Sequence, residues 1–189
     1  MADSRSDGSE AGVTLIELIV YSALLVVVST LVVGFFLSGL TTVNRVRDVS
    51  AASNTAQVVA DSVATNIRNS TDFGLSTPSG TDQFLVARTA QRGATLTWGC
   101  VAWYYSAAGA GTIYFKQSTA AILAPTPAQL ATWILVEDSV TPASGTRIFA
   151  ATGQQLSMNF VSQAGAYPPV VISSSATSRA GASGNLTCF

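Results

Sequence analysis

The fold of this chain is decided by residues 12–40, GVTLIELIVYSALLVVVSTLVVGFFLSGL. As an α-helix, residues 13–40 would be about 42 Å long, which is enough to cross the hydrocarbon core of a bilayer. A single acid, Glu17, lies within this apolar run. A carboxylate inside a bilayer is costly unless it is paired. Two interpretations are therefore open: Glu17 is an incidental acid that reaches toward the membrane edge, or it has a partner.

The composition bears on the classes of function that the chain can perform. Of its 189 residues, 48% are hydrophobic and only 10% are charged, with a formal net charge of -1. There is no His, so a Ser-His or Cys-His nucleophile pair and a His-containing zinc site are excluded. Metal-ligand spacings and a Gly-rich phosphate loop are also missing from the sequence. We therefore expect a protein that is not an enzyme and that has no cofactor and no metal site. The balanced charge gives no support to broad electrostatic binding of nucleic acid.

A helical pattern continues beyond the membrane-length run. Residues 1–11 are polar and acidic and are typical of a disordered leader. No proline occurs before Pro78, and the sequence predicts one helix from about Val13 to about Asn69. Its first part, residues 13–40, is the expected transmembrane segment, and residues 41–70 are its amphipathic continuation. Apolar residues at helical spacing predict that the continuation packs against the rest of the chain through Val43, Val46, Val49, Ala52, Ala56, Val59, Val63 and Ile67.

The remaining residues, 71–189, have the pattern of a β-rich domain. Residues 70–82, STDFGLSTPSGTD, predict a turn-rich connection. AAGAG at 107–111 predicts a hairpin loop, and TPAQL at 126–130 predicts one helical turn. The expected fold class is α+β: one long N-terminal helix packed on an antiparallel β-rich domain. The expected strands are residues 84–88, 94–105, 112–117, 132–137, 147–150, 155–161 and 170–175, with 185–188 as a last candidate.

The two cysteines, Cys100 and Cys188, lie far apart in the sequence. In a cytosolic protein they would be two unrelated buried thiols. Behind a membrane anchor, in an oxidising space, one disulfide is the favoured interpretation. On the chain-entropy model, closing a loop of this size stabilises the fold by about 4 to 5 kcal/mol.

Other side chains that attract attention are better explained by packing. The adjacent acids Glu137 and Asp138 would point to opposite faces of a strand, so they cannot hold a metal together. Lys116 is expected to be a solvated strand residue. Alternating aromatic residues in strands indicate core and cross-strand packing rather than a ligand-binding patch; they are Trp98, Trp103, Tyr104, Tyr105 and Tyr114.

The residues at the start of the apolar run carry a family resemblance. Gly12-Val13-Thr14-Leu15-Ile16-Glu17-Leu18 resembles the class III signal of type IV pilins and type II secretion pseudopilins. The order polar leader, long helix and β-rich domain is also similar to that family. Downstream, the segments CVAWYYSAAGAGTIYFKQ, WILVEDSV, LSMNFVSQ and PPVVISSSATSR are similar to PilW-type minor pilins and J-type minor pseudopilins.

This resemblance implies a processing event and an assembly device. Prepilin peptidase would remove the leader, residues 1–12, by cutting between Gly12 and Val13. Val13 would then be the N-methylated N-terminus. Glu17 would attract the N-terminal amine of a neighbouring subunit. The membrane and assembly helix would begin with Thr14, Leu15 and Ile16 around this acid.

Two features depart from the family pattern. The family usually has Lys or Arg immediately before the Gly, whereas Glu10 and Ala11 stand there in this chain, and Val13 replaces the usual Phe. In addition, Arg45 and Arg47 follow the apolar run, so the positive-inside rule favours the opposite orientation. We still place the leader inside, because long domains cross membranes largely regardless of flanking charge.

The implied function is that of a minor pilin or pseudopilin, a structural subunit that initiates or caps assembly of a type IV filament. Its partners would be other minor pilins, the major pilin, prepilin peptidase, the assembly platform protein and the membrane. It would lie in the cell membrane as a single-pass protein with its C-terminal domain outside, and later at a filament tip. The alternative is a filament-tip module that binds a surface or DNA. The DNA version requires convergence on one face of Arg88, Arg92, Arg147 and Arg179.

Overall fold

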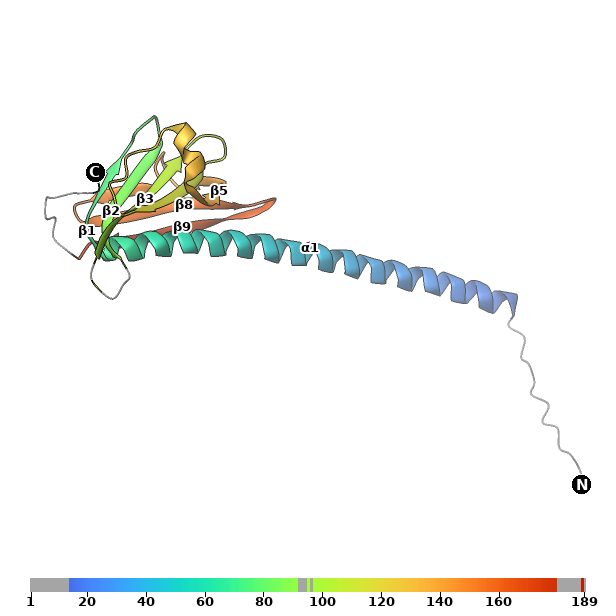
Figure 1. Cartoon of the computed structure of the whole chain (residues 1–189). Helices are drawn as coiled ribbons and strands as arrows, with labels where there is room; N and C mark the ends of the chain where they lie inside the picture. Colours follow the sequence, from blue (N-terminus) through green and yellow to red (C-terminus); the bar gives the residue numbers. More distant parts are fainter. Residues whose placement is uncertain (1–13, 92–94, 96, 180–187, 189) are drawn as a thin grey trace, which may run out of the picture. The chain divides into compact units, whose positions relative to one another are not determined.

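The computed structural model describes residues 14–91, 95, 97–179 and 188. A long helix, α1 (Leu15–Arg68), is followed in these residues by antiparallel strands and one 3-10 turn, η1 (Pro127–Thr132) (Figure 1). The predicted α+β fold is therefore confirmed. The chain divides into two units, residues 1–45 and 46–189, and α1 contributes residues to both.

Helix α1 is long because the sequence contains nothing that ends it earlier. Its only glycines are Gly34 and Gly39, and a Cβ added at either would meet nothing within 4 Å. Hydroxyl side chains bond to the backbone of the preceding turn, as Thr30 Oγ1 does when it donates to Val26 O at 2.8 Å. The helix ends at Arg68, one residue before the predicted end, and the predicted first residue, Val13, lies outside the described part of the chain.

The strands form two antiparallel sheets (Figure 1). The first has the order β1-β2-β3-β4-β5. In the second, β9 pairs along the whole of β8, so β6 and β7 share the opposite edge of β8. The strands are β1 (Ser70–Ser76), β2 (Gln83–Gln91), β3 (Thr97–Ser106), β4 (Thr112–Ser118), β5 (Ile134–Asp138), β6 (Val140–Pro142), β7 (Phe149–Thr152), β8 (Gln155–Ala164) and β9 (Tyr167–Thr177).

The structure adds two strands to those that the sequence predicts. The expectation of a turn-rich connection at 70–82 was wrong for its first half, because residues 70–76 form β1 and pair with β2. Strand β6 was also missed, and it is only three residues long. Neither segment has a strong β pattern of its own. Pairing with an established neighbour decides their conformation, and local propensity does not. The last candidate strand, 185–188, lies outside the described residues except for Cys188.

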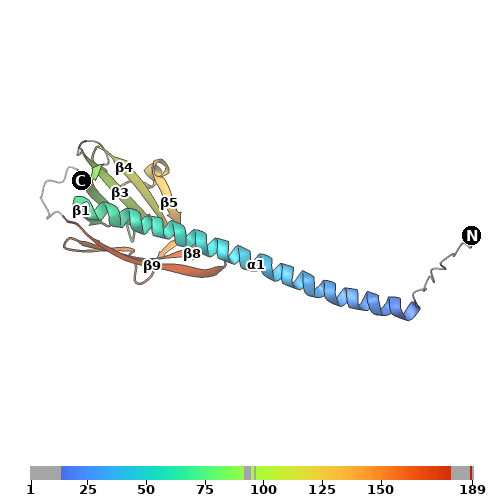
Figure 2. The same ribbon diagram turned by 90° about the horizontal axis from the view of Figure 1, so that it is seen from below.

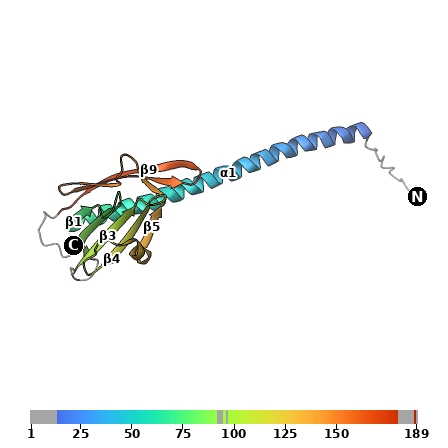
Figure 3. The ribbon, with the colours of Figure 1, turned by 90° about the horizontal axis from the view of Figure 1, so that it is seen from above.

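The main core lies between the last turns of α1 and the two sheets. Figure 2 shows these turns running across the domain, with β3 to β5 on one side and β9 on the other, and Figure 3 gives the same arrangement from above. Small side chains such as Ala56, Ala60 and Ala64 on the helix let the strands approach closely. They pack with large sheet residues, including Trp103 and Phe160, that are almost completely buried.

The packed face of the helix is shorter than the sequence predicts. It begins with Ala52 and ends with Ile67, with Val49 half-buried before it. Val43 and Val46 were expected to belong to this face, but both are exposed. The apolar stripe thus continues along the helix beyond the residues that the domain covers.

A buried amide joins the two sheets. Gln83, at the start of β2, is fully buried, and its Nε2 donates to Phe149 O at 2.8 Å. Its Oε1 accepts from Ile148 N at 2.7 Å and from Phe149 N at 3.0 Å. Buried polar groups stabilise a fold only when they are hydrogen-bonded, and this amide also fixes where β7 lies against β2.

The loop between β3 and β4 packs tightly against β6 at Gly111. This residue has a φ of +82°, and its O accepts from Val140 N at 3.0 Å. A Cβ built there would lie 1.8 Å from Val140 O, which is a backbone atom and cannot swing aside. We therefore expect Gly111→Ala to lower the free energy of unfolding by about 3 kcal/mol or more, through strain and the clash together.

Gly109, in the same loop, provides the matched control. Its φ is +64°, but a Cβ there would meet nothing within 4 Å. Gly109→Ala should cost only about 1 to 2 kcal/mol, the strain of a left-handed residue. Denaturant unfolding of both variants in detergent measures the difference, and equal costs would contradict the close packing of Gly111 against β6.

Candidate functional site: the first turns of helix α1

The candidate site begins at Thr14, the first described residue, immediately before helix α1. Glu17 N lies 3.0 Å from Thr14 O and 3.3 Å from Thr14 Oγ1. The Thr14 hydroxyl thus accepts from one of the first amides of the helix, which also donates to Thr14 O, as the hydroxyl of an N-cap residue does. The Glu17 carboxylate lies in the first turn, where the helix dipole favours a negative charge.

A second side chain contacts the Glu17 carboxylate. Tyr21 Oη donates to Glu17 Oε1 at 2.9 Å. The two residues are four apart and therefore lie on the same face of the helix, one turn from each other. Tyr21 was not among the site residues predicted from the sequence. Its spacing from the only acid of the apolar run was the signal that could have found it.

The apolar run around this acid is exposed along its length. Leu15 and Ile16, which the family resemblance places in the assembly helix, are 79% and 72% exposed. Within the described residues, α1 is long and apolar enough to cross a membrane by length and composition, with a mean hydropathy of 2.5 over 18 residues. A helix of this kind, followed by a β-rich domain, is compatible with a single-pass membrane protein. The predicted cleavage and methylation residues, Gly12 and Val13, lie outside the described part of the chain.

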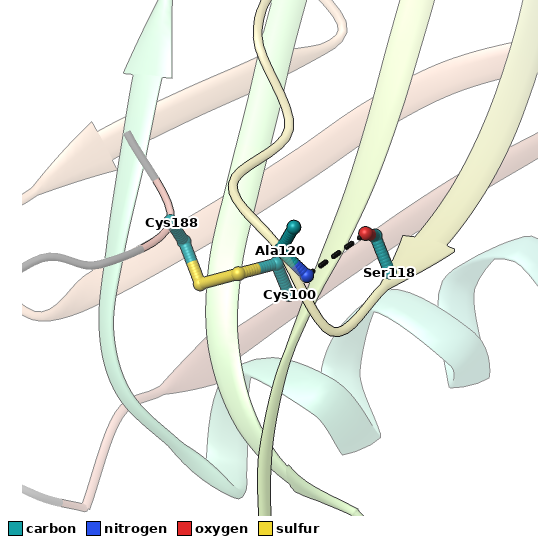
Figure 4. The surroundings of a disulfide bond; sticks show 4 residues. All are labelled: Cys100, Ser118, Ala120 and Cys188. Atoms are coloured by element: carbon teal, nitrogen blue, oxygen red, sulfur yellow. Dashed lines mark hydrogen bonds between the residues drawn. A yellow bond between two sulfur atoms is a disulfide. The ribbon is translucent and has the colours of Figure 1, made fainter.

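The predicted disulfide is present, and it lies on the face of the first sheet that is turned away from α1. Cys100 in β3 is bonded to Cys188, with a Cα–Cα distance of 5.6 Å (Figure 4). Both cysteines are buried, and Cys188 O accepts from Ile122 N at 3.3 Å. Next to them, Ser118 Oγ accepts from Ala120 N at 3.0 Å. The disulfide therefore fixes residue 188 and the segment after β4 to the face of the sheet that is turned away from α1.

The aromatic residues that the sequence assigns to packing behave in two ways. Trp103, Tyr104 and Tyr105 are buried, as predicted. The Tyr104 hydroxyl donates to Asp82 Oδ2 at 2.7 Å, and burial together with this carboxylate raises the pKa of Tyr104 well above its ordinary value. Trp98 is 37% exposed. These contacts indicate that the aromatic residues pack within the first sheet and along its edges.

Two cationic side chains near these aromatic residues contact aromatic rings. The Arg88 guanidinium lies 5.0 Å from the centre of the Trp98 ring. Lys116 was expected to be solvated, but it is half-buried and its Nζ lies 5.6 Å from the centre of the Trp133 ring. Cation–π contacts of this kind explain both positions.

Two of the arginines that DNA binding would require, Arg88 and Arg147, are not brought together by the structure. Arg147 lines two shallow clefts of about 310 and 420 Å³, one of which also includes Gln83 at the start of β2. Arg88 lies five residues after Gln83 in β2, so the Cα atoms of these two residues are roughly 17 Å apart at the usual rise of a strand. The Arg88 side chain lies with Trp98 on the face of the first sheet that is turned away from α1. Arg92 lies outside the described residues.

The acid pair in β5 follows the predicted alternation, since Glu137 is buried and Asp138 is exposed. Glu137 Oε1 accepts a hydrogen bond from Ser162 Oγ in β8, so the pair links the two sheets. Burial raises the pKa of Glu137, the Ser162 hydrogen bond opposes this, and the neighbouring Asp138 charge adds to it. Within the part of the chain that the structure describes, no group of three or more His, Cys, Asp or Glu side chains could hold a metal ion.

The raised pKa of Glu137 predicts a pH-dependent stability. The folded state binds this proton more tightly than the unfolded state does, so the free energy of unfolding falls as pH rises from the ordinary value of 4.5 through the raised value. Glu137→Gln removes this dependence and keeps an oxygen for Ser162. We expect the variant to have a higher Tm than the wild type at pH 7 and about the same Tm at pH 4.

Thermal unfolding at the two pH values measures this effect. Gln57→Ala, at an exposed position of α1 and without a titratable group, is the control and should change Tm equally at both pH values. A Glu137→Gln variant that is less stable than the wild type at pH 7 would show that the ionised carboxylate stabilises the domain.

Comparisons of this chain with models of protein families, with curated proteins and with solved structures found no match.

Proposed function

We propose that this chain is a minor pilin or pseudopilin, a structural subunit that initiates or caps assembly of a type IV filament. The observation that carries the proposal is the position of Glu17. Its carboxylate lies in the first turn of a helix whose following residues are apolar and exposed over a membrane-spanning length. The motif from Gly12 to Leu18, which resembles the prepilin signal, surrounds this acid.

In this proposal the charge of Glu17 directs assembly. Prepilin peptidase cuts between Gly12 and Val13, which creates a new amine four residues before Glu17, and the amine is then methylated. A carboxylate and an ammonium group are each costly to bury alone, but a pair of them restores much of the lost solvation. The amine of one subunit and the Glu17 carboxylate of the next therefore attract each other. The lack of a basic residue before Gly12 bears on the efficiency of cleavage and leaves this pairing unchanged.

The rest of the chain fits the same proposal. Lipid covers the exposed apolar helix before assembly, and neighbouring minor and major pilins cover it afterwards. Val43 and Val46, which are exposed at the end of the packed stripe, are further contact residues on this helix. The disulfide-bonded domain lies outside the membrane, where disulfides persist. The assembly platform protein moves the subunit from the membrane into the filament.

Fractionation of the host cells tests the proposal. Filaments are sheared from the surface and separated from membranes, and the chain is followed in both fractions by blotting. We expect the chain in the filament fraction of cells with prepilin peptidase, and only in the membrane fraction of cells without it. A chain that stays in the membrane of filament-producing cells would overturn the proposal.

A further inference from the structure

The contact between Tyr21 and Glu17 engages one oxygen of the carboxylate. Tyr21 Oη donates to Oε1. Within the described residues, Oε2 accepts no hydrogen bond. One oxygen is therefore held on the helix by Tyr21, and Glu17 itself is exposed.

The Tyr21 hydroxyl is used differently from the other hydroxyls nearby. Ser22 Oγ donates to Ile19 O at 2.9 Å, and Thr30 Oγ1 donates to Val26 O at 2.8 Å. These groups bond to their own backbone, which is the usual arrangement in an apolar helix. Tyr21 instead reaches a charged side chain, and hydrogen bonds to ionised acceptors are stronger than neutral ones.

We propose that Tyr21 is a positioning residue for Glu17. Its phenol fixes the rotamer of the carboxylate in the membrane and leaves Oε2 to bind the N-terminal ammonium group of a second subunit. This inference rests on the proposed function. A carboxylate that keeps one geometry before its partner arrives loses less conformational freedom on pairing, so the subunit joins the filament more readily.

Infrared spectroscopy of the full-length chain in lipid bilayers tests the contact itself. The chain is labelled with ¹³C-glutamate, and the carboxylate band of Glu17 is identified by its loss in Glu17→Leu. Tyr21→Phe keeps the ring and removes only the hydroxyl, so it should shift the Glu17 band. Thr30→Val, which removes a hydroxyl bonded to the backbone of the same helix, should leave the band in place.

The share of the chain in sheared filaments tests the role. We expect Tyr21→Phe to lower this share about tenfold, with the membrane-inserted amount unchanged, and Thr30→Val to keep the wild-type share. An unshifted band, or a shifted band with an unchanged share, would overturn the positioning role. If the wild-type chain never enters filaments, the proposed function is wrong, and so is the role of Tyr21 in assembly. The band shift in Tyr21→Phe would still show that Tyr21 contacts Glu17.

Discussion

Glu17→Leu should leave the chain in the membrane and remove it from the filament. Leucine extends the apolar run and favours a helix, so insertion becomes more favourable. In the proposed filament, the attraction between Glu17 and a neighbour's amine is lost, and that buried amine then has no counter-charge. Removing one partner of a buried ion pair costs about 3 to 5 kcal/mol, so incorporation should fall by roughly a hundredfold or more. Blotting of sheared filaments against membranes measures this ratio.

Two further variants separate charge from the other effects of this substitution. Glu17→Gln keeps an acceptor for Tyr21 but has no charge, so it should also lose incorporation. Ser22→Ala removes a polar group one turn along the same helix and should assemble like the wild type. Wild-type incorporation of Glu17→Leu would mean that Glu17 is an incidental acid near the membrane edge.

Loss of the disulfide should have the largest effect on the stability of the domain. Cys100 and Cys188 are 88 residues apart in sequence, so the closed loop is long. On the chain-entropy model, replacing both by Ala should lower the free energy of unfolding by about 4 to 5 kcal/mol. Domains are stable by only about 5 to 15 kcal/mol, so the change is a large fraction of the total.

Denaturant unfolding in detergent, with and without a reductant, measures this effect. The wild type should unfold at a lower denaturant concentration when it is reduced. The double variant Cys100→Ala/Cys188→Ala should unfold at that lower concentration under both conditions. The cluster that includes Ile122 and Trp133 on the outer face should loosen with it, because residue 188 is no longer held there. A midpoint that does not respond to the reductant would contradict a stabilising role of the bond.

The sequence predicted the features of the fold that depend on local pattern. Helix α1 could be predicted because its apolar residues recur at helical spacing with no proline to end it. Strand β3 was predicted from alternation and β8 from its β-rich composition, and alternation also placed Glu137 and Asp138 on opposite faces. The division into two sheets depends on contacts such as that of Gln83 with Phe149, which are 66 residues apart and leave no trace in a single sequence.

The residues of the candidate site could also be predicted only in part. Glu17 was predicted because an acid in an apolar run is rare. Tyr21 was missed although its spacing of four residues was visible, because a tyrosine in an apolar helix is unremarkable until its hydroxyl is seen on the carboxylate. The shortening of the packed stripe at Val43 and Val46 could not be predicted, because it depends on how far the sheets extend along the helix.

The intact mass of the chain from host filaments and membranes decides whether the chain is a processed filament subunit. We predict a polypeptide that begins at Val13, carries one added methyl group on its N-terminus and retains the disulfide. Fragmentation of the intact chain locates the methyl group and the first residue. A chain that retains residues 1–12 in filament-producing cells, or one that is cut after the apolar run and released from the membrane, would show that it is not a processed filament subunit.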